Sequence, residues 1–245
     1  MYMKRIFICA CVFYIAVFSS CSVQQNITLQ IDGAGSSQIS AELHPVFMKY
    51  YNDLASGFIS SFDPANPKYF DLDGIRDGFR RNPELQIAAL ETPQPGRLNI
   101  NFKIKNISEA IKNQDPQIQN VISRSKSGSK ETLRIYVDKK NLASILRMIP
   151  QAESPAVKML LPSEEISISE EEYCEHLAWA LEDYAANEKI EDVLKSSAVN
   201  LTIKTPRKIL SQTGGKLKSE TEVIFTVSVL RLFTLEKPVE FSVSY

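Results

Sequence analysis

Histidine is scarce in this chain. Only His44 and His176 occur in 245 residues, and neither has a second ligand at the spacing that a zinc site needs. Cys174 and His176 are two positions apart, which on a helix places them on different faces. They are therefore poorly placed to form a nucleophile–base pair. The HExxH, GxSxG, CxxC and P-loop motifs are absent. The sequence predicts no cofactor and favours a protein that is not an enzyme.

Cysteine and net charge are also low. The four cysteines are Cys9, Cys11, Cys21 and Cys174, and the first two lie in an apolar leader. Once that leader is removed and Cys21 is modified, Cys174 has no partner for an internal disulfide. The 28 basic and 29 acidic residues give a net charge of −1. This balance provides no general attraction to nucleic acid.

The first 20 residues have the parts of a secretory signal. Lys4 and Arg5 form a positive start, and residues 6–18 form an uncharged apolar run. As a helix, this run would rise roughly 20 Å at about 1.5 Å per residue, which is short of the ~30 Å hydrocarbon core of a bilayer. We therefore expect residues 1–20 to be a cleaved signal rather than a membrane anchor.

The end of this segment, Phe18-Ser19-Ser20-Cys21, resembles the lipobox of bacterial lipoproteins, in the looser form of spirochaete lipoproteins. The resemblance implies that the Cys21 thiol carries diacylglycerol, that the chain is cut before it, and that the new amine is acylated. Two or three acyl chains hold a protein stably on a membrane. The expected location is the cell envelope, on the periplasmic face, the outer membrane or the surface, with residues 21–25 as a short tether.

Residues 26–245 predict an α+β domain. Alternating apolar residues predict strands over 26–32, 84–91, 97–105 and 132–137, and three- and four-residue spacings predict helices over 43–58, 139–148 and from 169 onward. Ser169 and Glu172 form a capping box for the last of these helices. From residue 198 the pattern predicts a C-terminal antiparallel meander. We expect a mixed, mainly antiparallel sheet packed on helices, with an alternative subdivision near the prolines of residues 150–162. This order of helices and final strand hairpins resembles that of LppM-like bacterial lipoproteins.

One acidic spacing approaches a metal site. Asp71, Asp73 and Asp77 resemble the tail of a calcium loop, but Gly74 is misplaced for an EF-hand and Arg76 puts a positive charge inside the run. The competing interpretation is that Asp71 or Asp73 caps a short helix whose apolar face is formed by Ile75 and Phe79. The sequence favours the cap.

One basic segment suggests a contact surface. Residues 123–130 read SRSKSGSK, a polar loop in which Arg124, Lys126 and Lys130 are candidates for contact with lipid headgroups or another polyanion. The alternative is a solvated hairpin tip.

These features lead to one main functional hypothesis and two alternatives. The main one is a membrane-tethered, non-enzymatic binding module of the cell envelope, whose partner is an unidentified envelope protein or ligand. The first alternative is a hydrolase that uses only carboxylates, which requires converging Asp or Glu side chains with raised pKa values. The second is a carrier of an amphiphile, which requires an apolar cavity of about 300 Å³ or more.

Overall fold

The computed structural model describes residues 21–58, 60, 62–113, 120–147, 159–162 and 168–245. The helices of this part are α2 Pro45–Phe58, α3 Leu72–Arg80, α4 Ile107–Lys112, α5 Lys139–Arg147, α7 Glu170–Leu181, the 3-10 turn η2 Glu182–Tyr184, α8 Ile190–Ser196 and α9 Val229–Thr234. The strands are β1 Cys21–Leu29, β2 Gly35–Leu43, β3 Leu85–Gln94, β4 Arg97–Ile104, β5 Ile122–Ser127, β6 Lys130–Val137, β7 Ala198–Lys204, β8 Ser211–Thr213, β9 Gly215–Ser219, β10 Glu222–Ser228 and β11 Val239–Ser244. The α+β class predicted from the sequence is confirmed.

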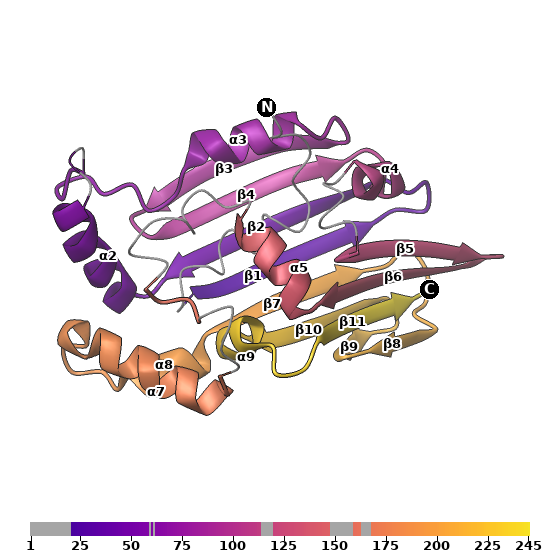
Figure 1. Cartoon of the computed structure of the whole chain (residues 1–245). Coiled ribbons are helices and arrows are strands. Elements are labelled where there is room, and N and C mark those ends of the chain that lie inside the picture. The colour runs from indigo at the N-terminus through magenta and orange to yellow at the C-terminus, as the bar shows by residue number, and fades with distance from the viewer. Residues whose placement is uncertain (1–20, 59, 61, 114–119, 148–158, 163–167) are drawn as a thin grey trace.

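The strands form two sheets (Figure 1). The larger has the order β3-β4-β2-β1-β7-β10-β9, and the smaller has the order β5-β6-β11-β8. Neighbouring strands are antiparallel, except that β1 and β7 run parallel. The predicted meander is thus divided: β7, β9 and β10 join the large sheet, whereas β8 and β11 belong to the small one. Phe225 of β10 stacks on Phe241 of β11 with ring centroids 5.0 Å apart, which joins the two sheets.

The residues expected to form a tether, 21–25, are part of a strand in this structure. Strand β1 begins at Cys21, and both Val23 and Gln25 are buried within the sheet. The side-chain amide of Gln25 donates a 2.9 Å hydrogen bond to the Ser37 hydroxyl, so both buried polar groups have a partner. Because Gln25 is polar, the alternation of buried residues along β1 is not visible in the sequence at this position. No residues therefore separate Cys21 from the folded sheet.

Strand β2 is not among the predicted strands, which leave residues 33–42 between the strand over 26–32 and the helix over 43–58. Its inward side chains are Ser37, Ile39, Ala41 and Leu43, which are all buried. Two of these are small, so the alternation is weak as a sequence signal. The turn between β1 and β2 is confined to residues 30–34, where the Gln30 N–H and the Ala34 carbonyl pair at 2.9 Å.

The predicted polar loop at residues 123–130 is instead part of a hairpin. Most of it is β5, which pairs with β6 from Ile122 opposite Ile135 to Ser127 opposite Lys130. Gly128 makes the tight turn with a φ of +62°, a conformation that favours glycine.

The helix caps follow the sequence prediction. Ser169 and Glu172 form the reciprocal capping box at the start of α7. Asp71 caps α3 by accepting a 2.9 Å hydrogen bond from the Gly74 N–H, and Ile75 and Phe79 are the buried face of that helix. Local side-chain chemistry decides these helix starts. Helix α9 was not predicted. The expected division near residues 150–162 falls mostly on 148–158, outside the described residues, and stays a prediction.

The two ends of the large sheet carry different elements. Cys21 pairs with Leu43, where β2 leads into α2. On its other side β1 runs parallel to β7, which starts at the same end of the sheet, just after α8. Helices α2, α7 and α8 gather at this end, which we call the Cys21 end, and the β5–β6 hairpin projects at the opposite, hairpin end (Figure 1). At about 3.3 Å per residue, β1 alone separates the two ends by roughly 26 Å.

Candidate functional site

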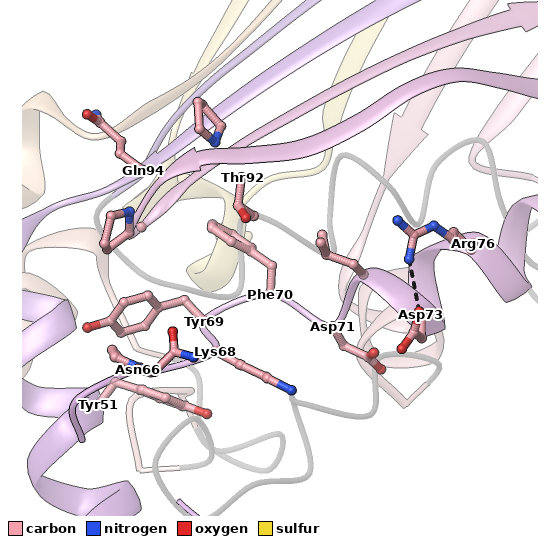
Figure 2. Close-up of a pocket in the computed structure, with 15 residues that line it drawn as sticks. Tyr51, Asn66, Lys68, Tyr69, Phe70, Asp71, Asp73, Arg76, Thr92 and Gln94 are labelled. Carbon is pink, nitrogen blue, oxygen red and sulfur yellow. Dashed lines mark hydrogen bonds and ion pairs between the residues drawn. The ribbon is translucent and has the colours of Figure 1, made fainter. Parts of the chain in front are cut away.

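A cleft of about 690 Å³ lies between the end of α2, the start of α3 and the β3–β4 turn (Figure 2). Ligand sites in proteins have volumes of about 300–1,000 Å³. The lining residues come from three separated segments: Tyr51; residues 66–73 with Arg76; and residues 92–96. The cleft exists only because the fold brings these segments together.

Aromatic rings form the inner wall of the cleft. Tyr69 and Phe70 are about 95% buried, and the Tyr51 ring lies 5.7 Å from that of Tyr69. Burial, followed by the proximity of Tyr69, raises the pKa of Tyr51.

Lys68 carries the positive charge available to a ligand. Figure 2 shows its ammonium group extending between Tyr51 and Asp71. The other cation in the lining, Arg76, is paired with Asp73 at 2.9 Å, and Asp71 is engaged as the α3 cap. Within the described ranges no ion pair of Lys68 is recorded. An anionic group on a ligand would therefore meet an available cation.

The three acidic residues considered as weak calcium-ligand candidates are used in other ways. Asp71 caps α3, Asp73 pairs with Arg76, and Asp77 pairs with Arg80 at 2.9 Å. Each aspartate thus has a local partner on or beside the same short helix. Among the described residues, no group of three His, Cys, Asp or Glu side chains is placed to hold a metal ion.

The cleft lies at the Cys21 end of the molecule. Its rim residue Gly96 accepts a 2.8 Å hydrogen bond at its carbonyl from the N–H of Leu43, and Leu43 is the strand partner of Cys21. Gly96 has a φ of +75°, and a Cβ there would lie 2.6 Å from the Met48 sulfur. The rim therefore favours glycine for its conformation, and a larger residue would also have to displace the end of the Met48 side chain.

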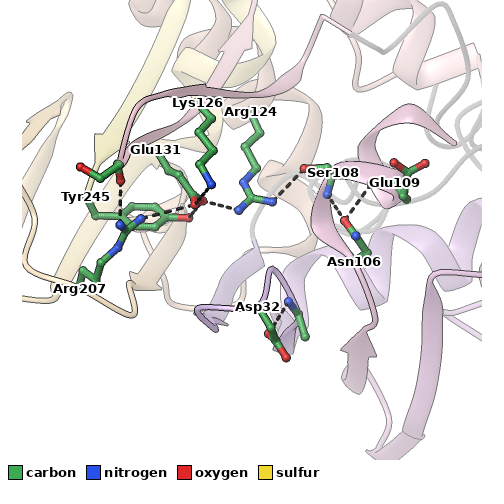
Figure 3. A network of polar contacts seen from close by, with 11 residues as sticks. Asp32, Asn106, Ser108, Glu109, Arg124, Lys126, Glu131, Arg207 and Tyr245 are labelled. Carbon is green, nitrogen blue, oxygen red and sulfur yellow. Dashed lines mark hydrogen bonds and ion pairs between the residues drawn. The ribbon is translucent and has the colours of Figure 1, made fainter.

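A second polar centre lies at the hairpin end (Figure 3). The Glu131 side chain is 8% exposed, and it pairs with Arg124, with Arg207 at 3.4 Å and with Lys126 at 3.9 Å. The Tyr245 hydroxyl lies 3.3 Å from the same carboxylate. Burial alone would raise the pKa of Glu131, but the hydrogen bond from Arg124 and the three positive charges hold it below its usual value. Glu131 therefore stays ionised and joins β5, β6 and the loop after β7.

The predicted contact residues differ in availability. Arg124 is 15% exposed and also donates a 2.8 Å hydrogen bond to the hydroxyl of Ser108 in α4, so its guanidinium group is engaged within the molecule. Lys126 and Lys130 are exposed. All three lie at the hairpin end, away from Cys21, so the sequence-based hypothesis that a short tether brings them to the membrane of the anchor has no support in this geometry.

The remaining reactive side chains to consider are Cys174 and the carboxyl groups whose pKa values are shifted. Cys174 is 2% exposed, and burial raises the pKa of its thiol. Of the described carboxyl groups, those with shifted pKa values are all lowered by hydrogen bonds or cations: Glu131, Glu172, Glu220 and Glu240. A general acid needs the opposite shift.

Sequence reasoning missed the cleft residues Tyr51, Lys68 and Tyr69. Tyr51 has the sequence pattern of one side chain of an amphipathic helix, so its own position gives no sign of a site. The signal that was present is the cluster Lys68-Tyr69-Phe70 directly after two prolines, because exposed loops that carry large side chains are frequent sites of binding.

Comparisons with known proteins give one match. No protein-family model and no curated protein matches the chain. Among solved structures, it is similar to the NMR structure of the folded domain of LppM from Mycobacterium tuberculosis, with a TM-score of 0.41 and 10% identity, over 100% of this chain and 92% of that one. This neighbour is a protein of the type that the predicted element order resembles, but the likeness is too slight to support a functional argument. No described helix is long and apolar enough to cross a membrane.

Proposed function

We propose that this protein is a lipid-anchored binding module of the cell envelope, and that the cleft at the Cys21 end is its ligand site. The anchor is supported by the Phe18–Cys21 motif. Because β1 starts at Cys21, the position of the lipid on the folded domain follows from the strand. A lipid on Cys21 would hold the Cys21 end of the sheet at the membrane surface, and the cleft would lie beside it.

The single observation that supports a ligand site is the cleft with Lys68 inside it. Its lining offers hydrogen-bonding groups, including the amides of Asn66 and Gln94. These groups suit a small molecule with several hydroxyl or amide groups and one negative charge, such as a sugar phosphate or a sugar acid. The protein would bind this ligand without converting it to a product.

The two alternatives have less support. In the cleft, the carboxylates of Asp71 and Asp73 are engaged by the α3 cap and by Arg76, whereas a hydrolase needs them directed at a substrate. The helix stripes that a carrier would use as a cavity wall are packed in the core, since Phe47, Leu177 and Leu181 are at most 3% exposed. The cleft itself is lined by many polar groups.

The anchor is tested by intact mass. We expect the membrane-extracted protein to have the mass of a chain that starts at Cys21 and carries diacylglyceryl and acyl groups, and a Cys21→Ser variant to lack these groups. A wild-type chain that retains Met1 and has no added mass would contradict the anchor.

The cleft is tested by calorimetry with the full chain. We expect glucose 6-phosphate to bind and Lys68→Ala to weaken it about tenfold, because a hydrogen bond to a charged group contributes about 1.5–3 kcal/mol. Lys49→Ala, an exposed lysine of α2 outside the cleft, should leave the affinity unchanged. If neither sugar phosphates nor sugar acids bind, or if both variants behave alike, the proposed site is wrong.

A further inference from the structure

Charge is distributed unevenly along the length of the molecule. At the Cys21 end, residues 170–196, which include α7 and α8, carry only two lysines, Lys189 and Lys195, against nine acidic side chains. These are Glu170, Glu171, Glu172, Glu175, Glu182, Asp183, Glu188, Glu191 and Asp192. Anionic lipid attracts basic side chains near its surface and repels acidic ones. The acidic helices therefore disfavour contact with an anionic membrane at this end.

The opposite end is basic. We call the β5–β6 hairpin, the loop after β7 and the β9–β10 hairpin the basic end (Figure 1). Its segments 124–131, 204–208 and 216–222 hold eight basic side chains and three acidic ones. The basic residues are Arg124, Lys126, Lys130, Lys204, Arg207, Lys208, Lys216 and Lys218, and the acidic ones are Glu131, Glu220 and Glu222.

Exposed aliphatic side chains lie among these cations. Ile31 is 78% exposed, Leu210 63% and Leu217 57%. Ile31 borders the same surface hollow as Lys126, Leu210 lies beside the end of β11 through its 2.8 Å bond to Ser244, and Leu217 stands between two lysines of the edge strand β9. Aliphatic side chains surrounded by lysine and arginine are typical of surfaces that insert shallowly into a bilayer.

With β1 directed away from the anchoring membrane, the basic end would lie beyond the reach of that membrane's surface charge. Strand β1 alone spans roughly 26 Å from Cys21 to Leu29, and a membrane's surface potential decays over about 8 Å at physiological ionic strength. Since β1 begins at Cys21, no flexible tether lets the domain turn over.

We propose that the basic end binds a second, anionic lipid bilayer, so that the lipid-anchored protein bridges two membranes. This inference rests on the lipid anchor of the proposed function but not on the cleft. The cations supply the attraction to anionic headgroups. A soluble polyanion would also satisfy these cations, but it would offer nothing to Ile31, Leu210 and Leu217, which need a hydrocarbon phase. The aliphatic side chains therefore favour a bilayer.

The test uses the full lipidated chain, reconstituted into phosphatidylcholine vesicles. Flotation of the protein with these donor vesicles checks the anchor separately. Fluorescent acceptor vesicles of phosphatidylglycerol and phosphatidylcholine in equal parts are then added, and their capture by immobilised donors is measured. We expect capture of these acceptors, little capture of pure phosphatidylcholine acceptors, and loss of capture at high salt.

Two variants and a control identify the surface. Lys126→Gln with Lys130→Gln should weaken capture about 30-fold, because each basic residue near an anionic surface contributes about 1 kcal/mol. Leu210→Ser with Leu217→Ser should weaken it at least about fivefold, by removing apolar insertion. The matched control, Lys189→Gln with Lys195→Gln at the Cys21 end, should not weaken it. All of these side chains except Lys189 and Lys195 belong to the basic end.

Several results would overturn the proposal. Anchored protein that captures no phosphatidylglycerol vesicles would do so, as would lysine variants that capture as well as the control. Unchanged capture in the Leu210/Leu217 variant, together with equal binding of polyphosphate, would assign the surface to soluble polyanions instead. If the chain fails to float with the donors, the anchor is wrong, and the same variants are compared by direct flotation of the protein with phosphatidylglycerol vesicles.

Discussion

Replacement of Glu131 by alanine is the sharpest test of how the hairpin end is held together. The Glu131 carboxylate is the shared partner of Arg124, Lys126, Arg207 and the Tyr245 hydroxyl. Its removal leaves Arg124, whose side chain is only 15% exposed, with the Ser108 hydroxyl as its recorded partner. A nearly buried charge would thus lose its counter-charge.

The size of the effect follows from burial. Removing one partner of a buried ion pair costs about 3–5 kcal/mol, because the remaining charge stays desolvated. Lys126 and Arg207 are more exposed and can turn to water, so we expect the lower end of this range, about 3 kcal/mol. Glu131→Gln should cost less, since an amide oxygen can still accept a hydrogen bond from Arg124.

Urea unfolding at neutral pH measures this free energy. The matched control is Glu240→Ala, which breaks an ion pair with Arg134 at 2.7 Å whose side chains are 44% and 42% exposed. An exposed pair contributes about 0.2–1 kcal/mol. If both replacements cost the same, or if Glu131→Ala costs less than about 1 kcal/mol, the buried-pair reasoning is refuted.

Acid should produce the same loss in the wild-type protein. The pKa of Glu131 is lower in the folded than in the unfolded chain, so the unfolded state binds more protons as the pH falls. The stabilisation is therefore complete above the unfolded value, near 4.3, and it is lost as the pH falls through the folded pKa. Glu131→Gln should show a shallower decline over this range, and parallel curves for the two proteins would contradict the assignment.

Two further predictions concern single positions elsewhere. Gly96→Ala should lower the free energy of unfolding by at least about 1–2 kcal/mol, because φ is +75° and a Cβ meets the Met48 sulfur. Gly57→Ala in α2, where a Cβ meets nothing within 4 Å, should stabilise slightly, and equal effects in urea unfolding would refute this difference. Cys174 should react with iodoacetamide only as fast as the chain opens, because burial shields the thiol and raises its pKa. Peptide mass spectrometry that finds equal labelling of Cys174 in native and urea-unfolded protein would contradict it.

The features correctly predicted from the sequence are local ones. The Ser169–Glu172 capping box, the Asp71 cap and the β3–β4 hairpin each depend on residues a few positions apart, whose side chains satisfy or terminate the backbone nearby. The strict alternation from Leu98 to Ile104 correctly predicted β4, since one face of that strand is buried. Such signals survive in any tertiary context.

The errors arose where distant segments decide the structure. Strand β2 carries Ser37 and Ala41 on its buried face, and it is a strand because β1 and β4 pair with it on both sides. The C-terminal strands were predicted as one meander because local alternation carries no information about which sheet a strand joins. Residue Arg124 was considered a surface cation, but its pairing with Glu131 on the neighbouring strand places it inside.

The sequence by itself determined the caps of α3 and α7 and the α+β class, since these depend on short-range chemistry and composition. Only the tertiary structure decided that β1 begins at Cys21 with no tether, that Tyr51, Lys68 and Gln94 share a cleft, and that the acidic helices and the basic hairpins lie at opposite ends. The physical reason is that these relations join segments far apart in the chain. They are fixed by strand pairing and burial across the whole domain, which no local pattern encodes.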